Sequence, residues 1–289
     1  MKQAARLVLL AVAGLLCIGS AGATDALNPT DHVAGHPAVT YFDLEKQIVT
    51  DLDSLPAHGE PTAHTIVPYR HIEGDDAKTD PAGPVAIQLL TAHTIHADGK
   101  SRLALLADLG PSDGAVAEFT LLALFDMTDQ AKLLDVVEVG TDRLTGFVGK
   151  PLALGRGSDL IVIDSDHFNS NEDFVGTEWL FVRNDRFRLV GSVSTFNVRI
   201  CTSRLTQSPA ITTGPDNGGG YRQVHLAVHE RLTLQPDRAD CSGEKIPRPL
   251  RRTFHAAYRW NAVRETFQIT SSDLKNLDRE NKKLTSGGL

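Results

Sequence analysis

Short apolar runs, each bounded by Gly, Asp, Asn or Pro, dominate the chain between residues 85 and 270. Runs of this kind are typical of strands joined by hairpins. They form three successive units, each of strand, loop, strand, tight turn and strand. The predicted strands are 103–107, 119–125 and 133–139 in the first unit, 160–163, 179–182 and 187–193 in the second, and 224–228, 254–260 and 267–269 in the third. The pattern predicts an all-β, mainly antiparallel fold of about three consecutive meander units of roughly 60 residues, either propeller-like or sandwich-like.

Alternation within these runs supports the strand interpretation, because successive side chains of a strand point to opposite faces. Phe187, Leu189 and Val193 fall mainly on one face of their run. Phe254, Ala256, Tyr258 and Trp260 share a face in the third unit. Large aromatic side chains dominate core burial, so we expect these rows to pack between sheets rather than to bind a ligand.

The two ends of the chain are less regular. Residues 24–84 are rich in Pro, His and Asp, with one short helix expected at Asp43–Leu52 and one strand-like stretch at His64–Tyr69. We interpret this region as an irregular N-terminal arm or a partial first unit packed on the β-rich repeat domain, residues 85–270. Residues 271–289 form a C-terminal tail with a possible short helix.

The first 23 residues have the pattern of a cleavable secretory signal. Lys2 and Arg6 precede the apolar run Leu7–Ile18, and Ser20–Ala23 offers a small-residue cleavage site. The run is too short for a membrane span, which needs about 20 apolar residues. A lipoprotein anchored through Cys17 is the alternative, but lipoprotein signals want a small residue before that cysteine and Leu16 stands there. The sequence therefore predicts a periplasmic or secreted protein that starts at Thr24, with no transmembrane anchor.

Charge narrows the range of partners. The whole chain has 29 basic and 36 acidic residues, and loss of Lys2 and Arg6 with the signal makes the mature protein more acidic. Binding to nucleic acid or to anionic lipid needs clustered Lys and Arg, and Arg248 with Arg251 and Arg252 is too short a cluster. We therefore expect an unknown protein, glycan or small ligand as partner and no nucleic acid.

Two cysteines, Cys201 and Cys241, remain after signal cleavage. Two thiols in an oxidising compartment predict one disulfide, and neither cysteine has the His neighbour or C-x-x-C partner of a reactive thiol. The bond would close a loop of about 40 residues and stabilise the fold by roughly 3–4 kcal/mol. We expect its role to be structural.

A family resemblance rests on two short segments. His96–Leu105 places an Asp-Gly turn at Asp98 and Gly99 before an apolar strand, and Gly157–Val162 repeats the arrangement in part. These segments resemble the opening of FG-GAP or VCBS-type β-propeller repeats. The resemblance implies a propeller-like stack of sheets that serves as a binding scaffold. The D-x-D-x-D-G calcium loop of that family has no full copy here, and three units are visible where those propellers usually have seven.

The segment Asp164–Asp173 alternates oxygen-bearing side chains with spacers, as a hard cation such as Ca²⁺ requires. We read it as a loop between two strands. The candidate calcium ligands are Asp164, Asp166, Asn169, Asn171 and Asp173. The alternative is a solvated loop with no ligand, because the spacing departs from that of an EF-hand.

Histidines offer a weaker candidate site. His225 and His229 are four residues apart in a run that reads as a strand, which separates them by some 13 Å and is too far for one metal ion. With His255 they are expected to be surface residues. Seven further histidines are scattered through the N-terminal third without metal-ligand spacing, and we expect them to reflect composition: His32, His36, His58, His64, His71, His93 and His96.

Two classes of function remain. The first is an exported β-rich binding or assembly module without a catalytic signature, since no nucleophile elbow, phosphate loop or paired zinc motif is present. The second is an extracytoplasmic hydrolase that uses the carboxylates of Asp164–Asp173, with or without a divalent cation. The first is favoured because a hydrolase needs a convergent set of acid, base and nucleophile. Carboxylates that converge in a cleft would favour the second.

Overall fold

The computed structural model describes residues 27–52, 62–63, 65–74, 77–78, 85–110, 119–140, 144–169, 172–200, 203–215, 220–235 and 248–286. The predicted signal peptide with Cys17, the predicted Cys201–Cys241 disulfide, and Asn171 lie outside the described residues. No helix in these ranges is long and apolar enough to cross a membrane.

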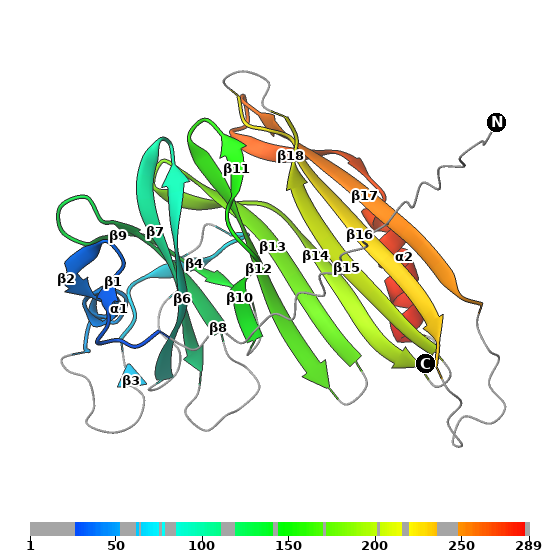
Figure 1. Cartoon of the computed structure of the whole chain (residues 1–289), viewed down its shortest axis with the longest axis horizontal. Helices are drawn as coiled ribbons and strands as arrows, with labels where there is room; N and C mark the ends of the chain where they lie inside the picture. The colour runs from blue at the N-terminus through cyan, green and yellow to red at the C-terminus, as the bar shows by residue number, and fades with distance from the viewer. Residues whose placement is uncertain are drawn as a thin grey trace, which may run out of the picture.

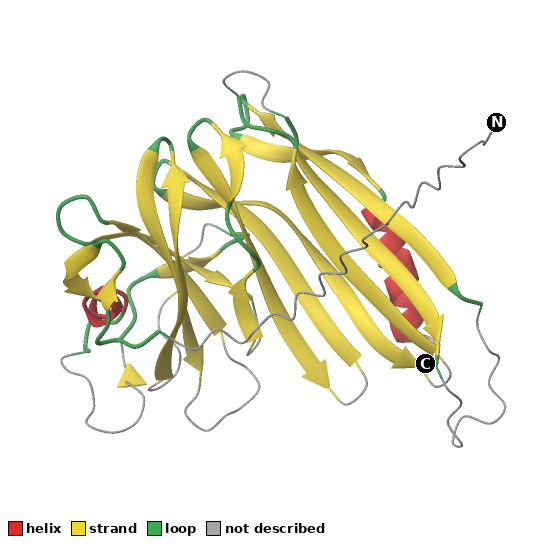
Figure 2. Cartoon of the chain, viewed as in Figure 1, coloured by secondary structure: helices red, strands yellow, loops and turns green. Residues whose placement is uncertain are grey.

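The first of two large sheets is seven-stranded and contains the first predicted unit (Figures 1 and 2). Its strand order is β3-β6-β7-β8-β9-β4-β5, and β4 lies parallel to β9 while the other pairs are antiparallel. Its strands are β3 (Thr62–Ala63), β4 (Tyr69–His71), β5 (Ala77–Lys78), β6 (Val85–Ala97), β7 (Lys100–Gly110), β8 (Phe119–Asp126) and β9 (Lys132–Val139).

The second sheet is nine-stranded and antiparallel throughout, with the order β10-β12-β13-β14-β15-β16-β17-β18 and β11 beside β12. Its strands are β10 (Leu144–Phe147), β11 (Leu152–Gly155), β12 (Ser158–Asn169), β13 (Glu172–Arg183), β14 (Arg186–Ile200), β15 (Ser203–Thr213), β16 (Val224–Leu234), β17 (Leu250–Asn261) and β18 (Thr266–Ser272).

A short hairpin and two helices complete the described structure. The hairpin β1 (His32–Val33) and β2 (His36–Thr40) leads into α1 (Tyr41–Ile48), where Thr40 and Asp43 form a capping box. The other helix, α2 (Leu274–Ser286), follows β18 and lies against the second sheet beside β15, β16 and β17 (Figure 1).

Three apolar layers hold these elements together. In the first, α1 and the N-terminal segment cover the face of the first sheet that carries Leu105 and Leu121. In the second, the opposite face of that sheet packs on the second sheet through Leu106, Leu122 and Leu180. The third layer fills the hollow of the curled second sheet, where α2 contributes Leu274 and Leu277.

The second sheet curls because its last hairpin folds back over β13 and β14. Gly191 permits the close approach, since a Cβ there would lie 2.7 Å from the Trp179 ring and 2.9 Å from the Tyr258 ring. The register shifts beside it, between Trp179 and Leu180, because Val190 of β14 is an extra residue that forms a β-bulge. Edge-to-face contacts then join the two ends of the curl, with Trp179 and Tyr258 at 5.5 Å and Phe181 and Phe267 at 5.4 Å between ring centroids. Phe254, Ala256 and Tyr258 are buried in this hollow, which confirms that their row is core. The prediction that Phe187, Leu189 and Val193 share a face is wrong, because the bulge directs Phe187 and Leu189 into the layer between the sheets and Val193 into the hollow.

The all-β, mainly antiparallel class is confirmed, and each predicted strand of the three units lies within an observed strand. The strand-like stretch predicted at His64–Tyr69 is not a strand over its described residues: Ile66 forms an isolated bridge with Val49, and only Tyr69 belongs to a strand, as the first residue of β4. The predicted short helix begins two residues early, as α1. The units are not separate sheets, however. The second and third units belong to one continuous sheet because β15, a strand that was not predicted from the sequence, pairs with both β14 and β16.

Candidate functional site: the split beside strand β14

The ladder of the second sheet is interrupted on one side of β14. Strand β14 pairs with β13 along almost its whole length, but with β15 only from Asn197 to Ile200. No described strand pairs with residues 186–196 on the β15 side. We call this unpaired edge of β14 the split.

Pro209 explains why the pairing of β15 with β14 stops. The N–H of Phe196 is directed away from β13, since it donates to Gln207 Oε1 at 3.1 Å. By alternation the N–H groups of Val198 and Ile200 point the same way, towards Leu205 and Ser203. The backbone nitrogens of Gln207 and Pro209 therefore face the split. A proline has no N–H to donate, so β15 cannot continue its ladder with β14 there.

Side chains take the place of a strand at both ends of the split. At one end Asp135 Oδ2 accepts the N–H of Phe187 at 2.8 Å, and Arg70 donates to the Phe187 carbonyl at 2.8 Å and to Asp135 at 2.9 Å. At the other end Gln207 accepts the N–H of Phe196. Because the bulge reverses the alternation, the backbone groups of Leu189, Ser192 and Ser194 face the split between these two ends.

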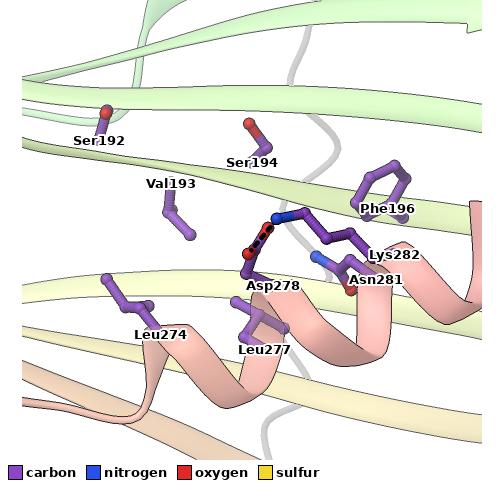
Figure 3. Close-up of a pocket in the computed structure, with 9 residues that line it drawn as sticks. All are labelled: Ser192, Val193, Ser194, Phe196, Leu274, Leu277, Asp278, Asn281 and Lys282. Atoms are coloured by element: carbon purple, nitrogen blue, oxygen red, sulfur yellow. Dashed lines mark hydrogen bonds and ion pairs between the residues drawn. The ribbon is translucent and has the colours of Figure 1, made fainter.

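Helix α2 covers the split from the side of the hollow. Figure 3 shows Val193 of β14 and Leu274 and Leu277 of α2 pointing towards one another, around a cavity of about 280 Å³. A buried polar network fixes the helix, because the Gln207 amide donates to Asn281 Oδ1 at 2.7 Å and to Glu230 Oε2 at 2.8 Å. Glu230 in turn accepts from Arg252 at 2.5 Å. Covering an open edge with a helix protects it from pairing with other chains.

A second cavity, of about 380 Å³, lies on the opposite face of β14, where the two sheets meet. We call it the Glu178 cavity. Its floor consists of cross-strand rows on β12, β13 and β14, and the hydroxyls of Ser192 and Ser194 point to this side, away from α2 (Figure 3). The rows are Ile163–Glu178–Ser192, Ser165–Gly176–Ser194 and His167–Phe174–Phe196.

Small residues in the middle row leave the space that forms the Glu178 cavity. Ser165, Gly176 and Ser194 lie between a row headed by Glu178 and a row of aromatic rings, so the sheet surface is lowest at its centre. A Cβ on Gly176 would meet only the Ser165 carbonyl oxygen, at 3.8 Å, which is ordinary contact. The glycine therefore leaves space that a side chain could fill.

The first sheet supplies the other wall, with His71 at the end of β4 and Gly140 directly after β9. Gly140 has φ of +65°, and a Cβ there would lie 2.9 Å from Thr145 Oγ1 and 3.0 Å from Ser165 Cβ. Only glycine fits both the backbone angle and the space. His71 Nδ1 accepts the N–H of Glu73 at 3.2 Å, which places the proton of a neutral ring on Nε2.

Electrostatics single out Glu178 within the cavity. Burial, reinforced by the charges of Glu73 and Glu138, raises the pKa of Glu178 to about 7, while a hydrogen bond from the Gly140 N–H acts in the opposite direction. Glu178 Oε2 is buried and has no hydrogen-bond partner in the described structure. An ionised carboxylate that is buried with an unpartnered oxygen destabilises the folded state unless a ligand or a proton neutralises its charge.

The aromatic row, His167–Phe174–Phe196, forms a further wall of the Glu178 cavity. Phe174 and Phe196 meet edge to face, with 4.8 Å between ring centroids, and the His167 ring lies 6.4 Å from that of Phe174. Aromatic faces beside an acidic group form an environment that favours cations. The Glu178 cavity thus combines a carboxylate that has one unpartnered oxygen, Oε2, with aromatic surface, as small-ligand sites commonly do.

The interpretation of Asp164–Asp173 as a loop is wrong. Residues up to Asn169 belong to β12 and residues from Glu172 to β13, and these strands pair from Leu160 with Phe181 to Asn169 with Glu172. The alternation that suggested spaced ligands is the two-residue period of a strand. Asp164 and Asp166 share the face of β12 that turns away from the Glu178 cavity, and burial raises the pKa of Asp164.

The described part of this segment does not assemble a cation site. Asp173 lies opposite Phe168 in the register and accepts a hydrogen bond from Asn197 at 3.5 Å. Among the described residues, no group of three or more His, Cys, Asp or Glu side chains is placed to hold a metal ion. The side chain of Asn169 and all of Asn171 lie outside the described residues, so the calcium hypothesis stays a prediction. Asp164, Asp166 and Asp173 line neither cavity at the split.

His225, His229 and His255 lie on strands, as expected. They are on the outer face of β16 and β17, with His255 opposite Ala227 in the register. They border a shallow cavity of about 570 Å³, and His229 is 3.2 Å from Thr253 Oγ1. His229 and His255 are exposed.

The Glu178 cavity was not predicted from the sequence. Ser165 and His167 stood inside the acidic segment that attracted attention, but as spacers, and His71 stood among the scattered histidines. The sequence signal for Glu178 is a carboxylate within the apolar stretch around Trp179–Val182 of a predicted strand. Charged side chains are seldom buried without a partner, so such a position points to a functional candidate.

Comparisons with known proteins offer no guide to this site: no protein-family model, no curated protein sequence and no solved structure matches the chain.

Proposed function

We propose that the protein is an exported binding module whose recognition site is the Glu178 cavity, and that this cavity takes a small organic cation or the cationic group of a larger ligand. The observation that carries the proposal is the buried, unpartnered Oε2 of Glu178 in a cavity with an aromatic wall. The export part rests on the signal-like residues 1–23.

The sign of the ligand follows from the charges around the cavity. Among the described residues that line it, none is Lys or Arg. Glu178 is a lining residue, and the charges of Glu73 and Glu138 are near enough to raise its pKa. A cationic ligand would offset this excess of negative charge, whereas an anion would increase it.

The other groups that line the Glu178 cavity can orient a bound ligand. The hydroxyls of Ser192 and Ser194 can donate or accept hydrogen bonds, and Phe174 and Phe196 offer ring surface to a cation. The Ser165 hydroxyl accepts a hydrogen bond from Thr145 at 3.1 Å and is thereby held in place. These hydroxyls and aromatic rings suit the binding and orientation of a ligand.

Titration calorimetry with methylammonium, tetramethylammonium and choline at pH 8 tests the proposal. We expect at least one of these cations to bind, and its affinity to fall about tenfold between pH 8 and pH 6, because protonation of Glu178 removes the negative charge. Glu178→Gln should remove the binding at both pH values.

Glu172→Gln is the matched control, since Glu172 is on the same strand but does not line the cavity. It should leave affinity within about twofold of the wild type. Equal affinities of the wild type and Glu178→Gln, or binding without any of this pH dependence, would contradict the proposal.

A further inference from the structure

A third cavity opens at the other end of the split. It has a volume of about 360 Å³ and lies between the turn after β4, the start of β14 and the β17–β18 turn. We call it the Arg70 cavity. Three arginines line it, each from a different element: Arg70, Arg188 and Arg264.

Arg70 is buried in the wall of this cavity and is held in place by hydrogen bonds. Its side chain is only 7% exposed, and one terminal nitrogen is committed to Asp135 and to the Phe187 carbonyl. Its Nε is buried and has no hydrogen-bond partner in the described structure. A buried guanidinium N–H without an acceptor is costly, and an acceptor supplied by a ligand would remove that cost.

The other arginines lack acidic partners. In the described part of the chain neither Arg188 nor Arg264 forms an ion pair, whereas Asp135 is paired with Arg70, and Glu265 with Arg183. Burial, and then the charges of Arg186 and Arg188, lower the pKa of Arg70 against the opposing effect of Asp135. Positive charge is thus in excess at this end of the split, with Glu73 as the unpaired carboxylate on the cavity wall.

Backbone geometry adds a further donor. Leu189 lines the Arg70 cavity, and its N–H faces the split, where no described strand pairs with it. Guanidinium groups and free backbone N–H groups together form the donor set that recognises carboxylates and phosphates.

We propose that the Arg70 cavity binds an oxyanion, either a free anion or the anionic group of a small ligand, through Arg188, Arg264 and the unsatisfied Nε of Arg70. This site is separate from the Glu178 cavity and of opposite charge, so the inference does not depend on the proposed cation site.

Thermal unfolding and calorimetry with inorganic phosphate and with acetate test this inference, at constant ionic strength maintained with chloride. We expect phosphate, acetate or both to raise the Tm of the wild type, because a ligand that binds only the folded state stabilises it. Preference for phosphate over acetate would indicate a phosphoryl ligand, and the reverse preference a carboxylate ligand.

The double variant Arg188→Gln with Arg264→Gln should lose at least tenfold in oxyanion affinity. Without added anion it should unfold no earlier than the wild type, since it removes mutually repelling charges, and this comparison separates loss of binding from loss of folding. Arg231→Gln, at an exposed position on β16, is the matched control and should bind like the wild type. Equal phosphate and acetate effects on the wild type and the double variant, or no effect on the wild type, would overturn the proposal.

Discussion

Strands β7 and β14 occupy comparable central positions in their sheets but differ in how completely they are enclosed. Leu105 and Leu106 are successive residues of β7, they face opposite apolar layers, and both are fully buried. Strand β14 has a partner along one edge only from Arg186 to Phe196, and three cavities open beside it. The comparison indicates that the first sheet supplies rigidity while the incomplete pairing of the second supplies room for ligands.

The sequences of the two strands reflect this difference. Strand β7 contains the uninterrupted apolar run Leu103–Ala107, which suits a strand covered on both faces. Strand β14 places small polar residues, Ser192 and Ser194, where a fully packed strand would carry large apolar ones. Substitutions in the two strands should therefore have different consequences.

The largest loss of stability is expected in β7. Leu106→Ala should lower the free energy of unfolding by about 3 kcal/mol, because the closely packed layer between the sheets cannot collapse around the lost methyl groups. Val193→Ala beside the split should cost only about 1 kcal/mol, since open space already adjoins this side chain. Urea unfolding of both variants measures the difference, and equal losses would mean that the two strands are enclosed alike.

The next effect concerns the network that fixes α2 over the split. Gln207→Ala should destabilise the protein by about 2 kcal/mol, because it leaves Glu230, Asn281 and the Phe196 N–H without their buried partner. Gln88→Ala, at an exposed position of β6, is the control and should change stability by less than about 0.5 kcal/mol. A Gln207 variant as stable as this control would show that the network does not anchor the helix.

A further effect on stability depends on pH. Glu178 has a pKa of about 7 in the folded protein, above the ordinary value near 4.3 of the unfolded chain, so the folded state holds its proton more tightly. Its contribution to stability is therefore fully present below about pH 4 and is lost as pH rises to about 7. Glu178→Gln should remove this loss, so at pH 8 its free energy of unfolding should exceed that of the wild type by up to about 3–4 kcal/mol. Parallel stability curves of the wild type and the variant from pH 4 to pH 8 would contradict the assignment.

The smallest effect on stability is expected for Gly176→Val, which should nevertheless abolish binding of the organic cation. Gly176→Val places a β-branched side chain in the free space of the Glu178 cavity and should change stability by no more than about 1 kcal/mol, with a gain expected because valine suits a strand better than glycine. The same variant should no longer bind the organic cation, although every charged group is retained. Unchanged cation affinity would place the ligand elsewhere.

Much of the fold could be predicted from periodicity, but the split could not. The apolar runs of β7, β8, β12 and β13 are long enough to predict these strands from the sequence. Strand β15 escaped notice because its sequence is largely polar and contains Pro209, a residue that usually argues against a strand. In this molecule the same proline marks the site, since it faces the edge where the ladder stops. Its significance emerges only once the register of β14 and β15 is known.

The candidate site was harder to predict than the strands because its residues are distant in sequence and individually ordinary. Glu178, Ser194 and His71 come together only through the pairing of β12, β13 and β14 and through the packing of the first sheet on this face. The acidic segment was predicted as a site because its carboxylates are close together in sequence, but strand geometry turns Asp164 and Asp166 to the other face. Which face a residue occupies depends on register, and register is set by contacts between strands.

Glu45 provides the internal reference for the most direct test. Burial raises its pKa to about 7, like that of Glu178, and both of its carboxylate oxygens are buried without hydrogen bonds, but it lies on the buried face of α1 and lines none of the described cavities. Carbon-13 NMR of carboxyl-labelled glutamates should therefore show two resonances that titrate near pH 7, one lost in Glu45→Gln and the other in Glu178→Gln. Addition of the bound organic cation should lower the apparent pKa of Glu178 by more than one unit, because the ionised form binds the cation more than tenfold more tightly than the protonated form, and leave that of Glu45 unchanged. A Glu178 resonance that titrates near pH 4, or one that does not respond to the cation, would contradict the account of the split as a ligand-binding site.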